Sequence, residues 1–248
     1  MVKRTFLALV SADDGSADDS AEAASRTLIE RAYAQLRDDI IEGRLAPGEK
    51  LRVEHLKTHY QVGAGTLREA ITRLVSDALV VAEGQRGFRV APMTLEDFLD
   101  LTQLRLHIEL EALRQSIRHG DAAWRVRLQQ AFDELAAFEQ PVRPEHRARW
   151  EQLNARFHET LTSAQASPWT VKVLRLLTRH GERYRRFTIG LVDSGRDVRD
   201  VHAEHREIFE LAMAGMEARA ALALEAHIRA TPDLLVRATR EGGQVLPA

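Results

Sequence analysis

The sequence predicts a mainly α-helical protein in two parts, a small N-terminal part that includes a short β-hairpin and a larger part made only of helices. Three observations support this prediction. Two short apolar segments and a glycine-flanked hairpin fall between residues 51 and 90. From Thr94 onward a helical period continues almost without interruption to about residue 238. Isolated glycines and prolines divide this second stretch into short-linked helices, which is typical of an antiparallel bundle.

The N-terminal part contains two short helical segments, residues 51–60 and 64–74, joined by a tight turn that ends at Gly63. A strand pattern follows at Leu79–Val81, and a basic hairpin spans residues 83–90. Two helices around a turn, followed by a basic hairpin, form a winged helix-turn-helix. Such a unit places its second helix in the major groove of duplex DNA. The sequence therefore predicts a DNA-binding domain.

The second of these helices holds the strongest candidates for base contact. Side chains that reach base edges come from the first turns of the inserted helix. Gly63 and Gly65 permit close backbone approach, and the unbonded N–H groups of a helix start favour a phosphate. The guanidinium of Arg68 can bond a guanine or a phosphate in bidentate fashion. The alternative, that Arg68 and Glu69 are only solvated helix residues, is disfavoured by the turn and wing that flank them. The expected DNA-contacting residues are Arg52, Lys57, Gly63, Ala64, Gly65, Thr66, Arg68, Arg73, Gln85, Arg86 and Gly87.

Charge is distributed unevenly along the chain. The whole protein nets −2, which argues against nonspecific coating of nucleic acid. Residues 50–92 hold seven basic and four acidic side chains and so net +3. We expect Arg52, Lys57 and Arg86 to contact phosphates, so that affinity for DNA falls as salt rises.

At these residues the chain resembles the GntR superfamily of bacterial transcription regulators. The resemblance rests on the Gly-x-Leu-x-Pro-Gly-x-x-Leu segment at residues 43–51, on Leu-Arg-Glu-Ala at 67–70 and on Arg-Gly at 86–87, and it covers roughly residues 28–92. Most relatives carry Ser-Arg-Thr-Pro where this chain has residues 63–66, so Ala64 replaces a base-reading arginine of the family pattern. The Gly-Ala-Gly variant and the wing look most like the carbon-starvation regulator branch, which represses catabolism of small dicarboxylates.

Length and composition agree with two domains. The chain has 248 residues, no cysteine and no apolar run long enough to span a bilayer. The absence of cysteine excludes disulfides, thiolate metal sites and cysteine nucleophiles, and we expect a cytoplasmic protein without a membrane partner. We expect a disordered tail at residues 1–25, because its small, acidic composition buries little apolar surface. The winged helix-turn-helix is expected at 26–92, a helical effector-binding and dimerisation domain at 93–240 and a second tail at 241–248.

The helical domain is predicted to be an antiparallel all-α bundle of six or seven helices. After a first helix capped by Thr94, helices are expected at about 122–139, 145–165, 168–190, 197–214 and 217–238. Three histidines fall on faces that point inward. His158 follows Asn154 by one turn, so the two share a face, and His205 and His227 lie on apolar stripes of two later helices.

These histidines have two interpretations. Each can be a hydrogen-bonded core residue, since an unpaired buried polar group costs on the order of 1–3 kcal/mol. Alternatively, the three imidazoles can converge on one divalent cation, zinc or nickel, with the Asn154 carbonyl as a fourth ligand. The resemblance decides between them, because regulators of the FadR type carry an FCD effector domain whose metal ligands are Asp-x-x-x-His, His and His. The matching positions here are Asn154, His158, His205 and His227. Asparagine in place of the commoner aspartate removes a charge and should weaken the hold on the cation.

An inward-facing arginine completes the expected effector site. Arg105 shares the interior stripe of the first bundle helix, so its charge needs an anion. That anion is either Glu109 or Glu111 of the protein itself, or the carboxylate of a small organic acid that also coordinates the metal. Arg183 and Arg186 are candidates for a second contact if the acid is a dicarboxylate. His202 lies off the apolar face and is assigned to solvent.

The predicted function is a DNA-binding transcriptional regulator, a repressor, that senses a small acid at a metal-containing pocket. The effector domain is expected to form a homodimer that sets the spacing of two DNA-reading heads. A histidine-metal hydrolase or lyase is the alternative, since three ligands with an open position also serve catalysis. Against it, the chain has no His-Glu-x-x-His motif, and a hydrolase does not need the wing. A scaffolding bundle without ligand would leave the buried arginine and histidines unexplained.

Overall fold

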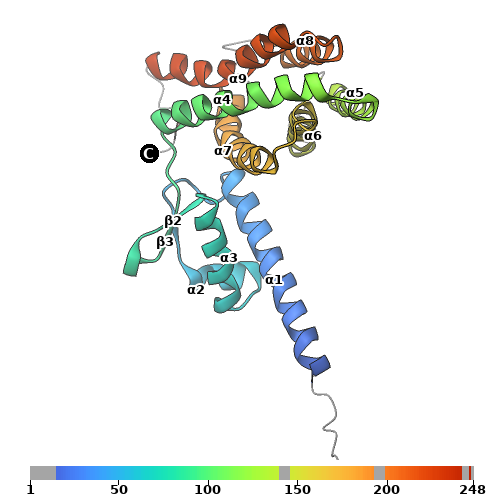
Figure 1. The fold of residues 1–248 in the computed structure, drawn as a ribbon. Coiled ribbons are helices and arrows are strands. Elements are labelled where there is room, and N and C mark those ends of the chain that lie inside the picture. The colour runs from blue at the N-terminus through green and yellow to red at the C-terminus, as the bar shows by residue number, and fades with distance from the viewer. Residues whose placement is uncertain (1–14, 140–145, 193–198, 242–245, 247–248) are drawn as a thin grey trace, which may run out of the picture. The chain divides into compact units, whose positions relative to one another are not determined.

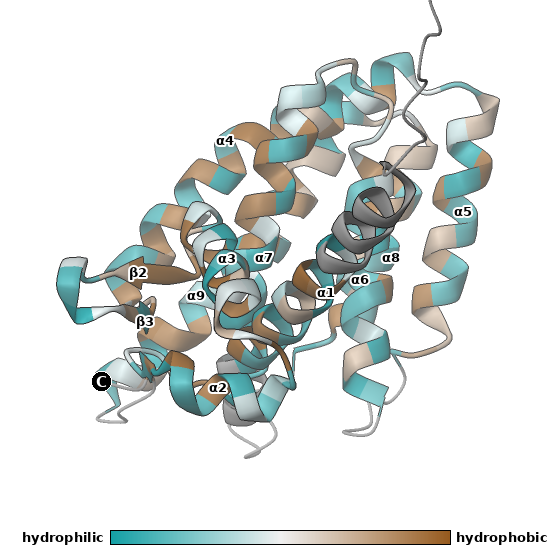
Figure 2. Cartoon of the chain, turned by 90° about the horizontal axis from the view of Figure 1, so that it is seen from below, coloured by the Kyte–Doolittle hydropathy of each residue, from teal (hydrophilic) through white to brown (hydrophobic). Residues whose placement is uncertain are grey.

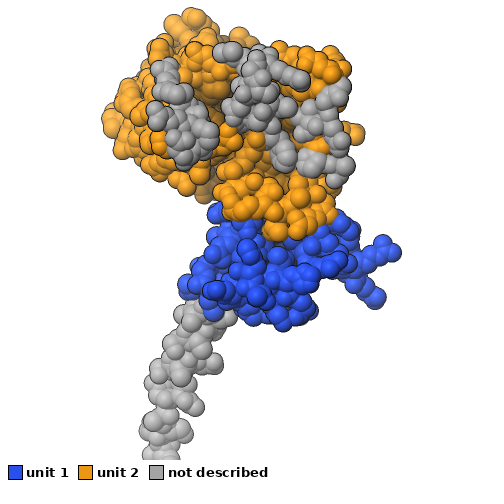
Figure 3. Space-filling view, turned by 180° about the vertical axis from the view of Figure 1, so that it is seen from behind, with its two compact units in different colours: residues 1–39, 50–89 blue, residues 40–49, 90–248 orange. Residues whose placement is uncertain are grey.

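The structure is a computed structural model that describes residues 15–139, 146–192, 199–241 and 246. The chain divides into two compact units, residues 1–39 with 50–89 (unit 1) and residues 40–49 with 90–248 (unit 2), coloured separately in Figure 3. The chain passes from unit 1 to unit 2 between residues 89 and 90, close to the domain boundary expected between residues 92 and 93. Residues 40–49, expected in the N-terminal domain, belong instead to unit 2.

Unit 1 contains the winged helix-turn-helix. In chain order its elements are α1 (Gly15–Ile41), β1 (Lys50–Leu51), α2 (Val53–Tyr60), α3 (Ala64–Ser76), β2 (Val80–Ala82), the 3-10 turn η1 (Gly84–Arg86) and β3 (Phe88–Val90). Figure 1 labels the three helices and the strands β2 and β3. The strands form one sheet in the order β1-β3-β2, with Lys50 opposite Arg89 and Leu51 opposite Phe88 in an antiparallel pair. Strand β1 was not predicted, because two residues are too few to show a period.

The apolar spacing of α3 explains how unit 1 folds. Leu67, Ala70, Ile71 and Leu74 recur every three or four residues and are completely buried. Gln61 ends α2 in the left-handed conformation, which turns the chain sharply before α3 begins. The opposite face of α3 is consequently left on the surface.

Helix α1 overlaps the segment that is expected to be a disordered tail. It starts at Gly15, inside the segment 1–25 for which a disordered tail is expected. Residues 21–24 read Ala-Glu-Ala-Ala, which have high helix propensity. Residues 15–25 are therefore corrected from tail to helix, and residues 1–14 lie outside the described residues, as does most of the tail expected at 241–248.

Unit 2 is the predicted all-α bundle. Its helices are α4 (Leu95–His119), α5 (Ala122–Ala136), α6 (Arg147–Leu161), α7 (Pro168–Val192), α8 (Val201–Met213) and α9 (Glu217–Arg240). Thr94, Asp121 and Asp200 each accept a hydrogen bond from a backbone N–H of the first helical turn, at α4, α5 and α8 respectively. The predicted fold class, a mainly helical protein with a small β wing, is confirmed.

The core of unit 2 is built from the apolar stripes of these helices. Helix α4 packs along α9 and α7, α8 packs on α9, and α5 packs on α6. Trp124 is fully buried, and its indole N–H donates to the carbonyl of Thr160 at 2.8 Å. Figure 2 shows hydrophobic and hydrophilic stretches alternating along α4 and α5, as expected for helices with one buried face. None of the described helices combines the length and apolarity needed to cross a bilayer.

Candidate DNA interface and candidate metal centre

The first turn of α3 presents open backbone to the surface. Gly63 is its N-cap in an extended conformation, with no side chain capping the helix. A Cβ added at Gly63 or at Gly65 would meet no atom within 4 Å. The first N–H groups of α3 are thus accessible, as an anion-binding helix start requires.

The arginines of α3 differ in their partners. Arg73 is held by Glu69 one turn earlier, Nη2 to Oε1 at 2.9 Å. Arg68 is exposed and forms no ion pair with any described residue. Its guanidinium is therefore free to bond a base or a phosphate, whereas that of Arg73 must first leave Glu69.

The wing is shaped by two glycines and held by one ion pair. Gly84 and Gly87 have φ of 57° and 94°, a region that residues with a Cβ rarely adopt. Arg89 binds Glu83 at 2.9 Å and joins the two ends of the hairpin. Gln85 and Arg86 are left exposed at the tip.

Two further basic residues lie near α2. Arg52 is exposed at its N-cap, and Lys57 pairs with Glu54 in the same helix. Within the described residues, neither Arg52 nor Arg86 forms an ion pair. Arg52, Arg68 and Arg86 thus give unit 1 three exposed, uncompensated cations, as a phosphate-binding surface needs.

The three inward histidines meet in unit 2. His158 on α6, His205 on α8 and His227 on α9 offer ring nitrogens that all lie within 4.8 Å of one another. His205 is completely buried, and its ring centroid lies 4.5 Å from that of His227. Nitrogens this close can reach a single cation at the usual metal–nitrogen distance of about 2.0–2.1 Å.

Each of these imidazoles has a carboxylate at Nδ1. The Nδ1 of His158 lies 3.1 Å from Glu109, and that of His205 lies 2.7 Å from Glu139. The Nδ1 of His227 lies 2.7 Å from Glu204 and 3.2 Å from Arg199. A guanidinium only donates and a carboxylate only accepts, so the shorter contact identifies Nδ1–H as a donor to Glu204. Carboxylates at Nδ1 leave each Nε2 with its lone pair, the arrangement usual for metal-binding histidines.

Burial and charge keep the imidazoles of His158 and His227 neutral. Burial lowers the pKa of His158 to about 4, although its hydrogen bond to Glu109 opposes the shift. Burial and the neighbouring His205 lower the pKa of His227 well below its ordinary value. Burial alone raises the pKa of Glu109, but the charge of Arg105 and the bond from His158 outweigh it, and the pKa falls to about 2. His158 and His227 are thus neutral imidazoles, and Glu109 is an ionised carboxylate, the protonation that a metal needs.

One buried ring nitrogen, Nε2 of His205, supports a bound cation at this centre. The Nε2 of His205 is buried and has no hydrogen-bond partner. A buried acceptor without a partner costs free energy that a bound cation would recover. Asn154 lies one turn before His158, is 3% exposed and lines the cavity beside the histidines. The residues therefore fit a divalent cation with nitrogen ligands.

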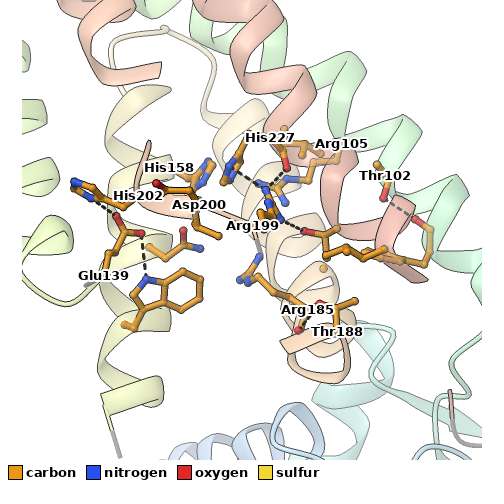
Figure 4. A pocket seen from close by; sticks show the side chains of 18 of the residues that line it. Thr102, Arg105, Glu139, His158, Arg185, Thr188, Arg199, Asp200, His202 and His227 are labelled. Atoms are coloured by element: carbon orange, nitrogen blue, oxygen red, sulfur yellow. Dashed lines mark hydrogen bonds and ion pairs between the residues drawn. The ribbon is translucent and has the colours of Figure 1, made fainter. Parts of the chain in front are cut away.

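A cavity of about 330 Å³ adjoins the histidines. Figure 4 shows His158 and His227 on it, together with guanidinium groups from three parts of the chain. Arg105 comes from α4, Arg185 from α7 and Arg199 from the segment before α8. Phe98, Leu101 and Ile228 line apolar parts of the same cavity. A cavity with cations on several walls suits a small anion.

Two expected effector contacts lie elsewhere. Arg183 donates from Nη2 to the carbonyl of Ala91 at 2.9 Å, and Arg186 lies between Glu182 and Glu42. Neither lines the cavity, whereas Arg185 between them does. On an α-helix Arg185 lies about 100° from Arg186 and about 160° from Arg183, so a face that turns Arg185 to the cavity turns the other two away from it. The structure thus places Arg185 on the cavity wall, and not the expected Arg183 and Arg186. Which residues contact an effector stays a prediction.

His202 is also corrected, from solvent to interior. It is 8% exposed, and its Nδ1 lies 3.1 Å from Glu139 while its Nε2 lies 2.6 Å from Arg206. Because both ring nitrogens are occupied, His202 has no lone pair left for a cation. It positions Glu139 together with Trp150, whose indole N–H donates to the same carboxylate.

Sequence reasoning missed Glu139 and Glu204, and it missed the contact of Glu109 with His158. It also missed the cavity arginines Arg147, Arg185 and Arg199. The sequence did offer one signal, because Arg105 and Glu109 are spaced by one helical turn. They form the expected alternative ion pair, Nε to Oε2 at 2.5 Å, while Arg105 also lines the cavity. Glu139 and Glu204 carry no such signal for His205 and His227, since they belong to other elements.

A basic helix-turn-helix with a wing, in one chain with a helical unit that holds a polar cavity, defines a DNA-binding transcriptional regulator. Residues 28–90 match the bacterial regulatory proteins of the gntR family, and residues 100–230 match the FCD domain. The chain is 43% identical to the helix-turn-helix-type transcriptional regulator BphR of Paraburkholderia xenovorans (strain LB400), over 83% of this chain and 84% of that protein. The protein belongs to the GntR family and carries an FCD domain.

Two further relatives agree with this assignment. The helix-turn-helix-type transcriptional repressor GlaR of Escherichia coli (strain K12) is 28% identical over 85% of this chain and 96% of that protein. The crystal structure of a GntR regulator from Rhodococcus sp. RHA1 aligns with a TM-score of 0.67 and 26% identity, covering 84% of this chain and 97% of that one. The curated relatives are named transcriptional regulators, and the protein is accordingly a regulator rather than an enzyme.

Proposed function

We propose that the protein is a homodimeric transcriptional repressor whose FCD domain holds zinc or nickel and senses a small dicarboxylate. One observation carries the proposal: three imidazoles with carboxylates at Nδ1 meet beside a cavity lined by guanidinium groups. A metal ion at the histidines and arginine side chains on the cavity wall would both attract an anion. Binding of that anion would then regulate the DNA-binding unit.

The metal would be held by His158, His205 and His227, with the Asn154 carbonyl as the fourth ligand. When bound, the cation supplies a Lewis acid that accepts a carboxylate oxygen at its open position. The surrounding glutamates fix the three rings, so that the ligand atoms need little reorganisation. Asparagine in place of a charged ligand favours a cation that can be exchanged.

The acid would lie between the metal and the cavity arginines. Arg105 and Arg185 come from different helices, so they can reach two carboxylates of one molecule. This supports a dicarboxylate and a relation to the carbon-starvation branch of the family. In this proposal the further contacts to the acid come from Arg185 and Arg199, because Arg183 and Arg186 lie outside the cavity.

DNA binding would use α3 in the major groove and the wing against the backbone. Two copies of the chain, held by the FCD domain, would read two half-sites about 34–36 Å apart. The acid would act by changing the relative population of states that fit this spacing. A cytoplasmic location belongs to the same proposal, because the operator lies there.

Selection of genomic fragments by the purified protein tests the proposal. Enriched fragments should share a palindromic sequence, and the genes beside it would name the acid. Metal content of the purified protein should show zinc or nickel at one equivalent per chain. Release of the fragments by a candidate acid, without turnover of that acid, is the expected result, whereas turnover would favour the metal-hydrolase alternative.

A further inference from the structure

Two of the cavity arginines are connected to the metal histidines through glutamates. On one side, Arg105 bonds Glu109, and Glu109 accepts from His158. On the other side, Arg199 bonds Glu204, and Glu204 accepts from His227. The same order of groups, guanidinium, carboxylate and imidazole, thus occurs twice beside one cavity. Figure 4 labels the arginine and the histidine of each series.

The first chain of contacts is almost completely buried. The side chains of Arg105, Glu109 and His158 are 11%, 3% and 5% exposed. Arg105 reaches Glu109 with Nε at 2.5 Å and Nη2 at 3.3 Å, while Oε1 of Glu109 lies 3.1 Å from His158. With so little water to screen it, the charge of Arg105 acts strongly on how Glu109 polarises the imidazole.

The second chain is more open but equally continuous. Arg199 binds both oxygens of Glu204, at 2.8 and 2.6 Å, and Oε2 of Glu204 lies 2.7 Å from Nδ1 of His227. Arg199 also donates to the backbone carbonyl of His227 at 2.7 Å. Arg199 is therefore connected to the ring of His227 through Glu204 and to the backbone of His227 directly.

We propose that Glu109 and Glu204 are positioning residues that couple anion binding at Arg105 and Arg199 to the metal affinity of the three-histidine centre. An acid carboxylate draws the guanidinium groups toward the cavity. Each glutamate then attracts the Nδ1–H of its histidine more strongly. This makes Nε2 of the same ring a stronger ligand for the metal. Acid and metal consequently strengthen each other's binding, without requiring the acid to touch the metal. This inference rests on the proposed metal site and extends it to two residues.

Glu151 provides a matched control. Its carboxylate is 4% exposed and binds Arg185, another cavity arginine, at 2.7 Å. Among the described residues it contacts no histidine. Glu151→Gln therefore removes a buried negative charge next to a cavity guanidinium and leaves the imidazoles untouched.

The first experiment measures zinc alone, by competition with a chromophoric chelator, on the full-length protein. Glu109→Gln and Glu204→Gln should each weaken zinc binding roughly 10- to 100-fold, and Glu151→Gln should leave it unchanged. Thermal unfolding of the metal-free proteins shows whether each variant is folded. If Glu109→Gln does not fold, the partly exposed Glu204 carries the test. Equal losses in all three variants would overturn the proposal, because general charge would then be the cause.

The second experiment repeats the zinc titration with saturating succinate or adipate. Wild-type protein should bind zinc about 5- to 150-fold more tightly with an acid that binds the cavity. The gain should be smaller in Glu109→Gln and Glu204→Gln than in wild-type protein and should remain at its wild-type size in Glu151→Gln, and the part left in the two variants is the direct bond of the acid to the metal. A gain of wild-type size in both glutamine variants would show that the acid acts only by coordinating the metal directly, and would overturn the coupling, as would wild-type zinc affinity that neither acid changes.

A third variant narrows the cavity next to Arg105. A Cβ at Gly181 would lie 3.7 Å from Nη1 of Arg105, so Gly181→Leu fills the space where an anion would bind. The effect of acid on zinc affinity should be lost in this variant, measured as the ratio of its zinc affinities with and without acid. Failure of the wild-type protein to bind zinc at all would instead overturn the proposed metal function, so the two failures are distinguishable.

Discussion

Arg68 is the residue on which recognition of DNA depends most. It is exposed near the start of α3 and has no ion-pair partner among the described residues, whereas Arg73 on the same helix is bound to Glu69. We expect Arg68→Ala to abolish specific binding, with a loss of about 1–3 kcal/mol for its base contact in each half-site. Fluorescence anisotropy with the selected operator and with a scrambled duplex measures the difference.

The control for this prediction is Arg118→Ala. Arg118 is an exposed arginine of unit 2 that is bound to Glu217, and removing it should leave operator affinity unchanged. An Arg68→Ala protein that still binds the operator with wild-type affinity and selectivity would show that α3 does not read the bases.

His205 and His202 form a natural pair for testing the metal centre. Both lie on α8 and both contact Glu139, but only His205 has a buried Nε2 without a partner. We expect His205→Ala to remove zinc from the purified protein, because two imidazoles and an amide are a poor tetrahedral set. His202→Ala should retain zinc, since its nitrogens are occupied by Glu139 and Arg206. Metal analysis after dialysis decides, and equal loss in both variants would count against the assignment.

Helix α7 illustrates how one element serves two purposes. One face lines the cavity with Gly181, Arg185 and Thr188. Other side chains hold the segments where the chain enters unit 2, since Arg183 bonds the carbonyl of Ala91 and Arg186 lies near Glu42. Tyr184 stacks on the cavity residue Phe98 with centroids 4.3 Å apart. A shift of α7 on binding an acid would therefore reach both of these segments directly.

The packing of α5 on α6 gives a stability prediction. Trp124 of α5 is fully buried and hydrogen-bonded to α6, whereas Trp169 at the start of α7 is 72% exposed. We expect Trp124→Ala to destabilise unit 2 by about 3–5 kcal/mol, and Trp169→Ala to change its stability by less than about 0.5 kcal/mol. Urea unfolding followed by the fluorescence of Trp150, which both variants keep, measures this. Similar midpoints for the two variants would contradict the packing described here.

Coupling between the two units gives a prediction for the whole protein. If an acid weakens operator binding by some factor, the operator must weaken binding of that acid by the same factor, because linkage is reciprocal. We expect a factor of about 5–150, equivalent to 1–3 kcal/mol. Calorimetric titration of the acid into free protein and into the protein–operator complex measures one side, and operator titration with and without acid measures the other. Operator affinity that no bound acid alters would refute regulation by this cavity.

Much of the fold was predictable because its signals are local. The turn before α3, the wing glycines and the helix breaks at Gly120, Pro168 and Gly215 act through φ restrictions that depend on one or two residues. The inward faces of His158, His205 and His227 follow from the helical period alone. The tail prediction was wrong at residues 15–25 because it weighed the composition of the segment over the helix propensity of its residues.

The partners of those side chains were not predictable, because a period tells which face is buried and not what lies against it. Glu109, Glu139 and Glu204 meet histidines that lie 49, 66 and 23 positions away in the chain. The choice of Arg185 over Arg183 and Arg186, and the burial of His202, depend on how α7 and α8 are rotated against their neighbours. Residue pattern thus identified the two functional units and the imidazoles, whereas packing between helices assigned each imidazole its carboxylate and each arginine its place.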